Sequence, residues 1–236
     1  MSRFVLIAGA WHGAWCWERV AQRLRSLGHD VVTPDLPGTA GVAPDARGVS
    51  LEAWAEFVVD SLRRGEPAVL VGHSRAGVVI SRAAELAPEH VRRLVYIAAY
   101  LLPAGGTVAD AGRADAASLV APNMIPARSG LTCTLRPDIV RDAFYACCSD
   151  FDAAAASARL TPEPLKPLVT PLDVTTARFG RVPRAYVECL RDRAVTIGAQ
   201  RGMRAALPCE PVLTLDTDHS PFLSCPSGLA DWLGGL

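Results

Sequence analysis

The sequence has no excess of charge of either sign and no long apolar run. Lys and Arg together number 24, as do Asp and Glu, so the formal net charge is zero. Nucleic acids and anionic membrane surfaces bind through clustered positive charge, and the balance argues against both as partners. A membrane-spanning helix needs about 20 apolar residues in a row, which the sequence lacks. The stretch MSRFVLIAGAW predicts a first core strand rather than a signal peptide.

Disulfide and metal frameworks are also missing. The seven cysteines are an odd number, and no CxxC pair or Cys/His spacing typical of a zinc site occurs among them. A chain of this length can bury a sizeable hydrophobic core and does not need disulfide bonds or a structural metal ion for stability. We therefore expect reduced, mostly buried thiols in a cytoplasmic protein, with no metal and no cofactor. A small-molecule substrate is the expected partner, and a homodimer remains open.

Short apolar runs alternate with longer segments of helical periodicity, and 50% of the residues are hydrophobic. This alternation is typical of an α/β fold, in which a mainly parallel sheet is covered by helices on both faces. Ser50 is the expected N-cap of the second helix. We expect about six strands, at 4–8, 30–33, 68–71, 93–98, 184–189 and 211–215, and helices at 14–27, 51–63, 76–86, 197–206 and 226–233.

Residues 103–182 interrupt this alternation. They contain a Gly-Gly pair, many prolines and an Ala-rich helix at 151–160, but no clear strand–helix unit. Long insertions in α/β enzymes usually cover the site, so we predict a cap over a core formed by 1–102 and 183–236, all within a single structural domain. Apolar side chains of this cap are available to line a pocket: Leu119, Met124, Phe144, Tyr145 and Phe151.

The stretch GHSRAG (72–77) lies between a predicted strand and a predicted helix. In a nucleophile elbow, small residues stand two positions before and two positions after the serine, so that the serine Oγ projects above the sheet. Gly72 and Ala76 hold those positions around Ser74, although a glycine is usual at the second. The alternative is a plain turn in which Ser74 caps the helix. The pattern favours a nucleophile.

A nucleophilic serine needs a basic histidine and a carboxylate that orients it. His219 directly follows the last predicted strand, where catalytic groups of parallel sheets collect. His12 lies in the loop after the first strand, and the turn directs the His73 side chain away from Ser74. His29 and His90 belong to surface-like connections. His219 is therefore the predicted base.

The chain order Ser…Asp…His points to Asp192, which follows the strand at 184–189. A surface ion pair of Asp192 with Arg191 or Arg193 is the alternative. The other candidate carboxylates are weaker: Asp173 lies in the predicted cap, Glu188 within a strand, and Asp216 and Asp218 too close to His219 in sequence.

Two backbone N–H groups should stabilise the oxyanion. We expect one from Arg75, directly after the nucleophile, and one from Ala10 in the loop after the first strand. The Arg75 cation at a helix N-terminus opposes the helix dipole, so its side chain should have an acidic partner. Either that ion pair braces the turn, or Arg75 points into the pocket and binds an acidic or polar substrate group.

Five motifs, in order along nearly the whole chain, make the sequence resemble the α/β-hydrolase superfamily. They are VLIAGAWHGAWCW (5–17), VVTPDLPG (31–38), LVGHSRAG (70–77), YVECLRDRAVTIGAQRGM (186–203) and DTDHSPFL (216–223). The chain is most similar to the branch of plant methyl esterases and hydroxynitrile lyases with their bacterial esterase relatives. The resemblance implies a six-stranded sheet without the N-terminal hairpin, a triad of Ser74, Asp192 and His219, and amide donors at Ala10 and Arg75.

The branch contains two chemistries, and two positions separate them. The lyases carry a threonine after the first strand and a lysine after the catalytic histidine, where this sequence has Gly9 and Ser220. A small neutral residue cannot supply the lysine's cation, which disfavours lyase activity. The predicted pocket residues are Gly9, Trp11, Met124, Phe144, Tyr145 and Ser220.

The leading hypothesis is a cofactor-free serine hydrolase that cleaves a carboxylic ester through an acyl-enzyme. A small methyl or alkyl ester or a lactone, with an apolar or aromatic part, is the expected substrate. A non-hydrolytic lyase or a biosynthetic cyclisation catalyst in the same pocket is the alternative. A ligand receptor on this fold is a third possibility, because a fold alone does not establish catalysis.

Overall fold

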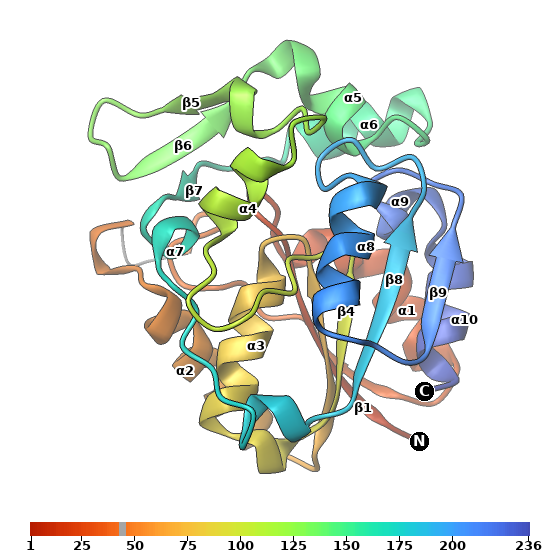
Figure 1. Ribbon diagram of the computed structural model, residues 1–236. Helices are drawn as coiled ribbons and strands as arrows, with labels where there is room; N and C mark the ends of the chain where they lie inside the picture. The colour runs from red at the N-terminus through yellow and green to blue at the C-terminus, as the bar shows by residue number, and fades with distance from the viewer. Residues whose placement is uncertain (43–45) are drawn as a thin grey trace.

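A six-stranded parallel sheet forms the centre of the protein. The computed structural model describes residues 1–42 and 46–236, and its main sheet has the strand order β2-β1-β3-β4-β8-β9 (Figure 1). All neighbouring strands run parallel, as the sequence predicted. The strands are β1 (Arg3–Ile7), β2 (Asp30–Val32), β3 (Ala68–His73), β4 (Val91–Ile97), β8 (Arg184–Cys189) and β9 (Val212–Leu215).

Helices cover both faces of this sheet, because alternate strand residues bury apolar side chains on opposite sides. Side chains such as Leu6 and Val71 pack on one face against α1 (Glu18–Ser26) and α10 (Pro226–Gly234). The alternate residues, such as Leu70, pack on the other face. The helices there are α2 (Leu51–Leu62), α3 (Ala76–Leu86) and α8 (Ile197–Ala206).

Local capping sets the helix boundaries. The hydroxyl of Ser50 accepts a hydrogen bond of 3.1 Å from the N–H of Ala53, which confirms Ser50 as the N-cap of α2. The helix expected at 14–27 was wrong at its start. Residues Ala14–Trp17 form a 3₁₀ turn instead, in which Cys16 N–H donates to Gly13, and α1 begins only at Glu18.

The strand order places the ends of β1 and β3 at a switch point. The chain runs from β1 outward to β2 and then returns to β3 on the other side of β1. Loops after two such strands leave in opposite directions and open a crevice at the carboxyl edge of the sheet. The loop 8–13 and the turn at Ser74 flank this crevice.

The segment 103–182 adds no strand to the main sheet. It builds an antiparallel sheet of β5 (Met124–Pro126), β6 (Thr132–Leu135) and β7 (Glu163–Pro164). Its helices are α4 (Val108–Ala114), α5 (Val140–Phe144), α6 (Asp150–Ser157) and α7 (Lys166–Val169). Figure 1 shows the small sheet, α5 and α6 beyond the carboxyl ends of the main strands. An apolar cluster that includes Trp11 and Phe144 joins the segment to the loop after β1.

The sequence predicted only the Ala-rich helix of this segment, and with shifted ends. The helix α6 begins at Asp150, after the Ser149 side chain that caps it, and ends at Ser157. The strands β5 to β7 have two to four residues, too few to show an alternating pattern. No helix among residues 1–42 and 46–236 is long and apolar enough to cross a membrane.

Candidate active site

Ser74 stands on a sharp turn between β3 and α3. Its φ of 53° lies in the left-handed region, which costs a non-glycine residue about 1–3 kcal/mol. Hydrogen bonds hold the turn: Ser74 N–H donates to Ile97, and Ser74 C=O accepts from Gly77 and Tyr100. A strained serine held in this way is typical of a nucleophile elbow rather than of a helix cap. Consistent with this, the N-cap position of α3 is held by Arg75 and not by Ser74.

Two glycines of the GHSRAG stretch are required by close packing. A Cβ on Gly72 would lie 2.9 Å from the carbonyl oxygen of Ala76, where α3 crosses β3. A Cβ on Gly77 would lie 2.3 Å from the carbonyl oxygen of Tyr100. Gly77 is therefore needed for the close contact with Tyr100 after β4. The fifth position of the motif is held by Ala76, which is fully buried.

Asp192 and His219 meet in the interior. The Nδ1 atom of His219 lies 2.7 Å from Asp192 Oδ2, and both residues are buried. The N–H groups of Ala194 and Val195 donate to Asp192 Oδ1 over 2.7 and 2.9 Å. Burial raises the pKa of Asp192, and these hydrogen bonds oppose the rise.

Asp192 does not pair with its arginine neighbours, so the surface ion pair considered for it is wrong. Arg191 pairs with Asp216, and Arg193 pairs with Asp142. Two of the weaker candidate carboxylates are also engaged elsewhere. Asp173 is exposed beside Arg82. Asp218 accepts the N–H of Cys147 and so ties the loop of His219 to the segment 103–182.

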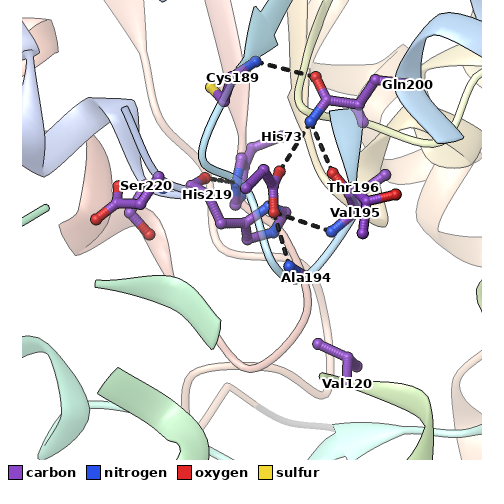
Figure 2. Close-up of polar contacts among 12 residues, drawn as sticks. His73, Val120, Cys189, Ala194, Val195, Thr196, Gln200, His219 and Ser220 are labelled. Carbon is purple, nitrogen blue, oxygen red and sulfur yellow. Dashed lines mark hydrogen bonds and ion pairs between the residues drawn. The ribbon is translucent and has the colours of Figure 1, made fainter. Parts of the chain in front are cut away.

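Gln200, a residue that the sequence analysis did not single out, fixes the Asp192 carboxylate. Figure 2 shows its side chain between Cys189 and Val195. Its Nε2 donates to Asp192 Oδ2 over 3.0 Å and to Val195 C=O over 2.7 Å, and its Oε1 accepts from Cys189 N–H. Gln200 is the buried residue of α8. A polar residue on the inward side of an amphipathic helix was the signal that could have identified it.

His73 holds the backbone of His219 by a hydrogen bond and packs against its ring. Its Nε2 lies 2.8 Å from the carbonyl oxygen of His219, and the two rings are 4.5 Å apart between centroids. A carbonyl oxygen only accepts, so Nε2 of His73 carries the hydrogen. Burial lowers the pKa of His73 well below its usual value, and the ring is neutral. His73 therefore positions His219 and leaves His219 as the candidate base.

Two N–H groups at the crevice are free to bind an oxyanion. Among the described residues, the N–H groups of Ala10 and Arg75 donate no hydrogen bond. The next residue after Ala10, Trp11, has a φ of 62°, and its N–H donates to Glu163 Oε2 over 3.0 Å. Glu163 belongs to β7, so the segment 103–182 holds the loop after β1 in place.

The Arg75 side chain has the acidic partner that the sequence predicted. Its Nε lies 2.8 Å from Glu163 Oε1, and both side chains are buried. Arg75 Nη2 also donates to Gly9 C=O over 3.0 Å, and the guanidinium lies 4.3 Å above the ring of Trp54. Burial raises the pKa of Glu163, and Arg75 and the Trp11 N–H oppose that rise. The pair thus connects the Ser74 turn, the loop after β1 and β7.

A cavity of about 370 Å³ opens beside Ser74. Its wall is mainly apolar, which favours a ligand with an apolar body and few polar groups. Three of the expected pocket residues, Trp11, Met124 and Phe144, line it. Other lining residues are Ala10, Ser74, Arg75, Tyr100, Val108, Val120, Leu165, Leu168 and Val195.

Five residues expected at the pocket lie outside this lining. Tyr145 is buried with its hydroxyl 2.7 Å from His12, and Ser220, the residue after His219, is also buried. Gly9 packs against the side chains of His73 and Ser74. Phe151 is 80% exposed on the outer side of α6, and Leu119 packs in the apolar cluster around Phe144.

The buried ring of His12 predicts a loss of stability in mild acid. Nδ1 of His12 bonds Ala10 C=O and Nε2 bonds the Tyr145 hydroxyl, and burial lowers its pKa from 6.5 to about 4. Between pH 6.5 and about 4, His12 binds a proton in the unfolded chain but not in the folded chain, so the unfolding free energy falls with falling pH. We expect His12 to account for about 2 kcal/mol of lost unfolding free energy between pH 7 and 5.

Urea unfolding of the wild type and of His12→Gln at both pH values measures this loss. The difference in unfolding free energy between the two proteins should shrink by that amount at pH 5. An equal pH dependence in both proteins would show that folding does not lower the pKa of His12.

No group of three or more His, Cys, Asp or Glu side chains that could hold a metal occurs in the described part of the chain. All seven cysteines are free thiols.

Residues 4–232 match the alpha/beta hydrolase family. The chain is 31% identical over 241 residues to putative methylesterase 11, chloroplastic, of Arabidopsis thaliana, and the match covers 97% of this chain. It is 29% identical over 242 residues to methylesterase 7 of the same plant, covering 97% of this chain and 93% of that protein. The chain spans 62% of the length of the first relative.

Two solved structures of hydrolases align with nearly the whole chain. A pyrethroid hydrolase from Sphingobium faniae JZ-2 aligns with a TM-score of 0.86 at 27% identity, covering 99% of this chain and 96% of that chain. An extracellular α/β-hydrolase from a Paenibacillus species, which shares structural and functional homology with tobacco salicylic acid binding protein 2, aligns with a TM-score of 0.83 at 27% identity, covering 99% and 98%. With its six-stranded sheet and these matches, the chain belongs to the alpha/beta hydrolase family.

Proposed function

We propose that this protein is a serine hydrolase that cleaves a carboxylic ester. Ser74 is the nucleophile, His219 the base, and Asp192 the carboxylate that orients His219. The observation that carries the proposal is the buried 2.7 Å contact between Asp192 and His219 at the sheet edge where Ser74 stands on its strained turn. The methylesterase names of the relatives support ester hydrolysis as the reaction.

The hydrogen bonds of Asp192 explain how His219 can act as a base. Asp192 accepts the hydrogen of His219 Nδ1, which leaves Nε2 with a free lone pair. His219 Nε2 then takes the proton from Ser74 Oγ as Oγ attacks the ester carbonyl. Asp192 stays ionised and stabilises the imidazolium that forms.

The oxyanion of the tetrahedral intermediate lies between the N–H groups of Ala10 and Arg75, which have no other described partner. His219 gives its proton to the departing alkoxide, and an ester bond joins the acyl group to Ser74. A water molecule, deprotonated by His219, then attacks this acyl-enzyme. The carboxylic acid leaves and Ser74 regains its proton.

The cavity suggests the substrate. Its apolar wall and its volume of about 370 Å³ suit a small methyl or alkyl ester, or a lactone, with an apolar or aromatic part. We assign the segment 103–182 as a cap, because its residues Met124 and Phe144 line the cavity. The seven free thiols support a reducing compartment such as the cytoplasm.

Lyase chemistry has less support. The position after His219 is occupied by Ser220, which is fully buried and neutral. It offers no cation to a leaving group such as cyanide. Gly9 lies against Ser74 and His73, with no hydroxyl to replace the threonine of the lyases.

Turnover of a series of p-nitrophenyl esters with short acyl chains tests the proposal. The wild type should hydrolyse at least one of them, and Ser74→Ala should lower kcat by about 10⁴-fold or more. Ser129→Ala, on an exposed turn of the cap, is the matched control and should retain full activity. Full activity in Ser74→Ala would exclude the serine mechanism.

A further inference from the structure

Tyr100 is a cavity residue whose hydroxyl has no hydrogen-bond partner among the described residues. It follows β4, and its N–H donates to Ser74 C=O over 3.1 Å, so the backbone of Tyr100 is fixed to the Ser74 turn. Its side chain lines the cavity and is 8% exposed. The Tyr100 hydroxyl lies next to Gly112 of α4. A Cβ added to Gly112 would lie 3.4 Å from the hydroxyl oxygen, which is an ordinary contact distance.

The other three tyrosines of the chain are all satisfied. The hydroxyl of Tyr96 bonds Ser81 over 2.8 Å, that of Tyr145 bonds His12 over 2.7 Å, and that of Tyr186 donates to Ala99 C=O over 2.8 Å. The Tyr100 hydroxyl is not among the fully buried polar atoms without a partner, so it is accessible from the cavity. Tyr100 is therefore the exception, and its hydroxyl is available to bond a molecule in the cavity.

The surroundings of Tyr100 define the chemistry of that partner. Burial and the nearby carboxylates of Asp192 and Asp115 raise the pKa of Tyr100, so it remains a neutral phenol that can donate. The same two carboxylates disfavour an anionic group beside it. The adjoining cavity wall is apolar at Val108, Val120 and Val195, and the cation of Arg113, which also lines the cavity, is paired with Asp110. A neutral oxygen acceptor on an otherwise apolar ligand is the group that fits.

We propose that the Tyr100 hydroxyl binds a neutral ether, ketone or hydroxyl oxygen on the acyl part of the ester, across the cavity from the reacting carbonyl. This inference rests on the proposed function of Ser74 and narrows its substrate class. Tyr100 is a specificity-determining residue, because an ester with only hydrocarbon in this place leaves the hydroxyl unpaired.

Methyl phenylacetates that carry either a methoxy or an ethyl group, at the meta or the para position, are suitable probes. The two groups are similar in size, and only methoxy has an acceptor oxygen. For at least one position, wild-type kcat/KM should be about tenfold higher for the methoxy ester. Tyr100→Phe should bring this ratio close to one. Ratios that are equal in the two proteins, whether high or near one, would overturn the proposal.

A binding measurement separates this inference from the proposed function. Calorimetry of the same esters measures binding without hydrolysis. With Ser74→Ala, the methoxy ester should bind with a Kd about tenfold lower than that of the ethyl ester. With Ser74→Ala/Tyr100→Phe, the two Kd values should be nearly equal. If the wild type hydrolyses no ester, the proposed function fails, while this binding ratio still decides the role of Tyr100. Its absence in Ser74→Ala would reject that role.

Thermal unfolding provides the control for folding. Tyr100→Phe should leave Tm unchanged or raise it, because it removes an unpaired hydroxyl. Tyr186→Phe removes a satisfied hydroxyl and should lower Tm by about 2–4 °C. An equal drop in both variants would mean that the Tyr100 hydroxyl is bonded within the protein, which contradicts the proposal.

Discussion

Replacing Asp192 with Asn is expected to lower kcat for ester hydrolysis by about 10⁴-fold. The Asn amide can still accept the N–H groups of Ala194 and Val195 with its oxygen. Its NH₂ group then faces His219 Nδ1, where a donor meets a donor. His219 must move its hydrogen to Nε2 to bond the amide, and Nε2 can no longer remove the proton of Ser74.

Steady-state kinetics of Asp192→Asn, with its Tm measured in parallel, checks this expectation. The loss should appear in kcat, because the tautomer of His219 matters for the reaction and little for binding of the ester. Asp216→Asn, an exposed carboxylate paired with Arg191 close to the same loop, is the matched control and should keep normal kcat. A folded Asp192→Asn protein with more than a tenth of wild-type kcat would contradict the assigned role.

Glu163→Gln should destabilise the protein by about 3–5 kcal/mol, because it leaves the buried Arg75 cation without its counter-charge. The Gln side chain has nearly the same shape and can still accept the N–H of Trp11. The loss of unfolding free energy therefore reports mainly the removed negative charge of Glu163. Urea unfolding measures it. Asp138→Asn breaks an exposed pair with Arg136 and should leave the unfolding free energy nearly unchanged.

A double substitution separates the ion pair from its surroundings. Arg75→Met/Glu163→Leu removes both charges together and should cost less unfolding free energy than either single substitution. Additive losses would show that Arg75 and Glu163 contribute independently.

The buried ion pair of Arg75 favours one of the two roles considered for its side chain. As a brace, it holds Gly9 and, through Glu163, the N–H of Trp11. Arg75→Met should therefore change kcat/KM for acidic and neutral esters by the same factor. A rise in KM confined to acidic esters would show that the guanidinium binds substrate.

Much of the central fold was predictable because its signals are local. The bounds of α3, β8 and α8 agree with the sequence prediction to the residue. The placement of Ser74, Asp192 and His219 at one edge of the sheet was predictable in the same way, because each follows the end of a strand by one to four residues.

The residues that the sequence did not indicate act through contacts between distant positions. Glu163 lies 88 residues from Arg75 and sits in a strand of two residues. Nothing in the sequence around it marks it as buried. Gln200 and Tyr100 resemble ordinary residues of a helix and a loop until the fold places them against Asp192 and the cavity. Short strands, buried ion pairs and cavity walls depend on such packing rather than on periodicity.

The most direct test of the central claim is covalent labelling of Ser74 by a fluorophosphonate probe, followed by peptide mass spectrometry. An activated serine oxygen attacks phosphorus and expels fluoride, so the adduct identifies the nucleophile. We predict a single adduct on Ser74 in the wild type, much slower labelling in Asp192→Asn and none in Ser74→Ala. An unlabelled wild-type protein, or an adduct on a different residue, would contradict the assignment of Ser74 as the catalytic nucleophile.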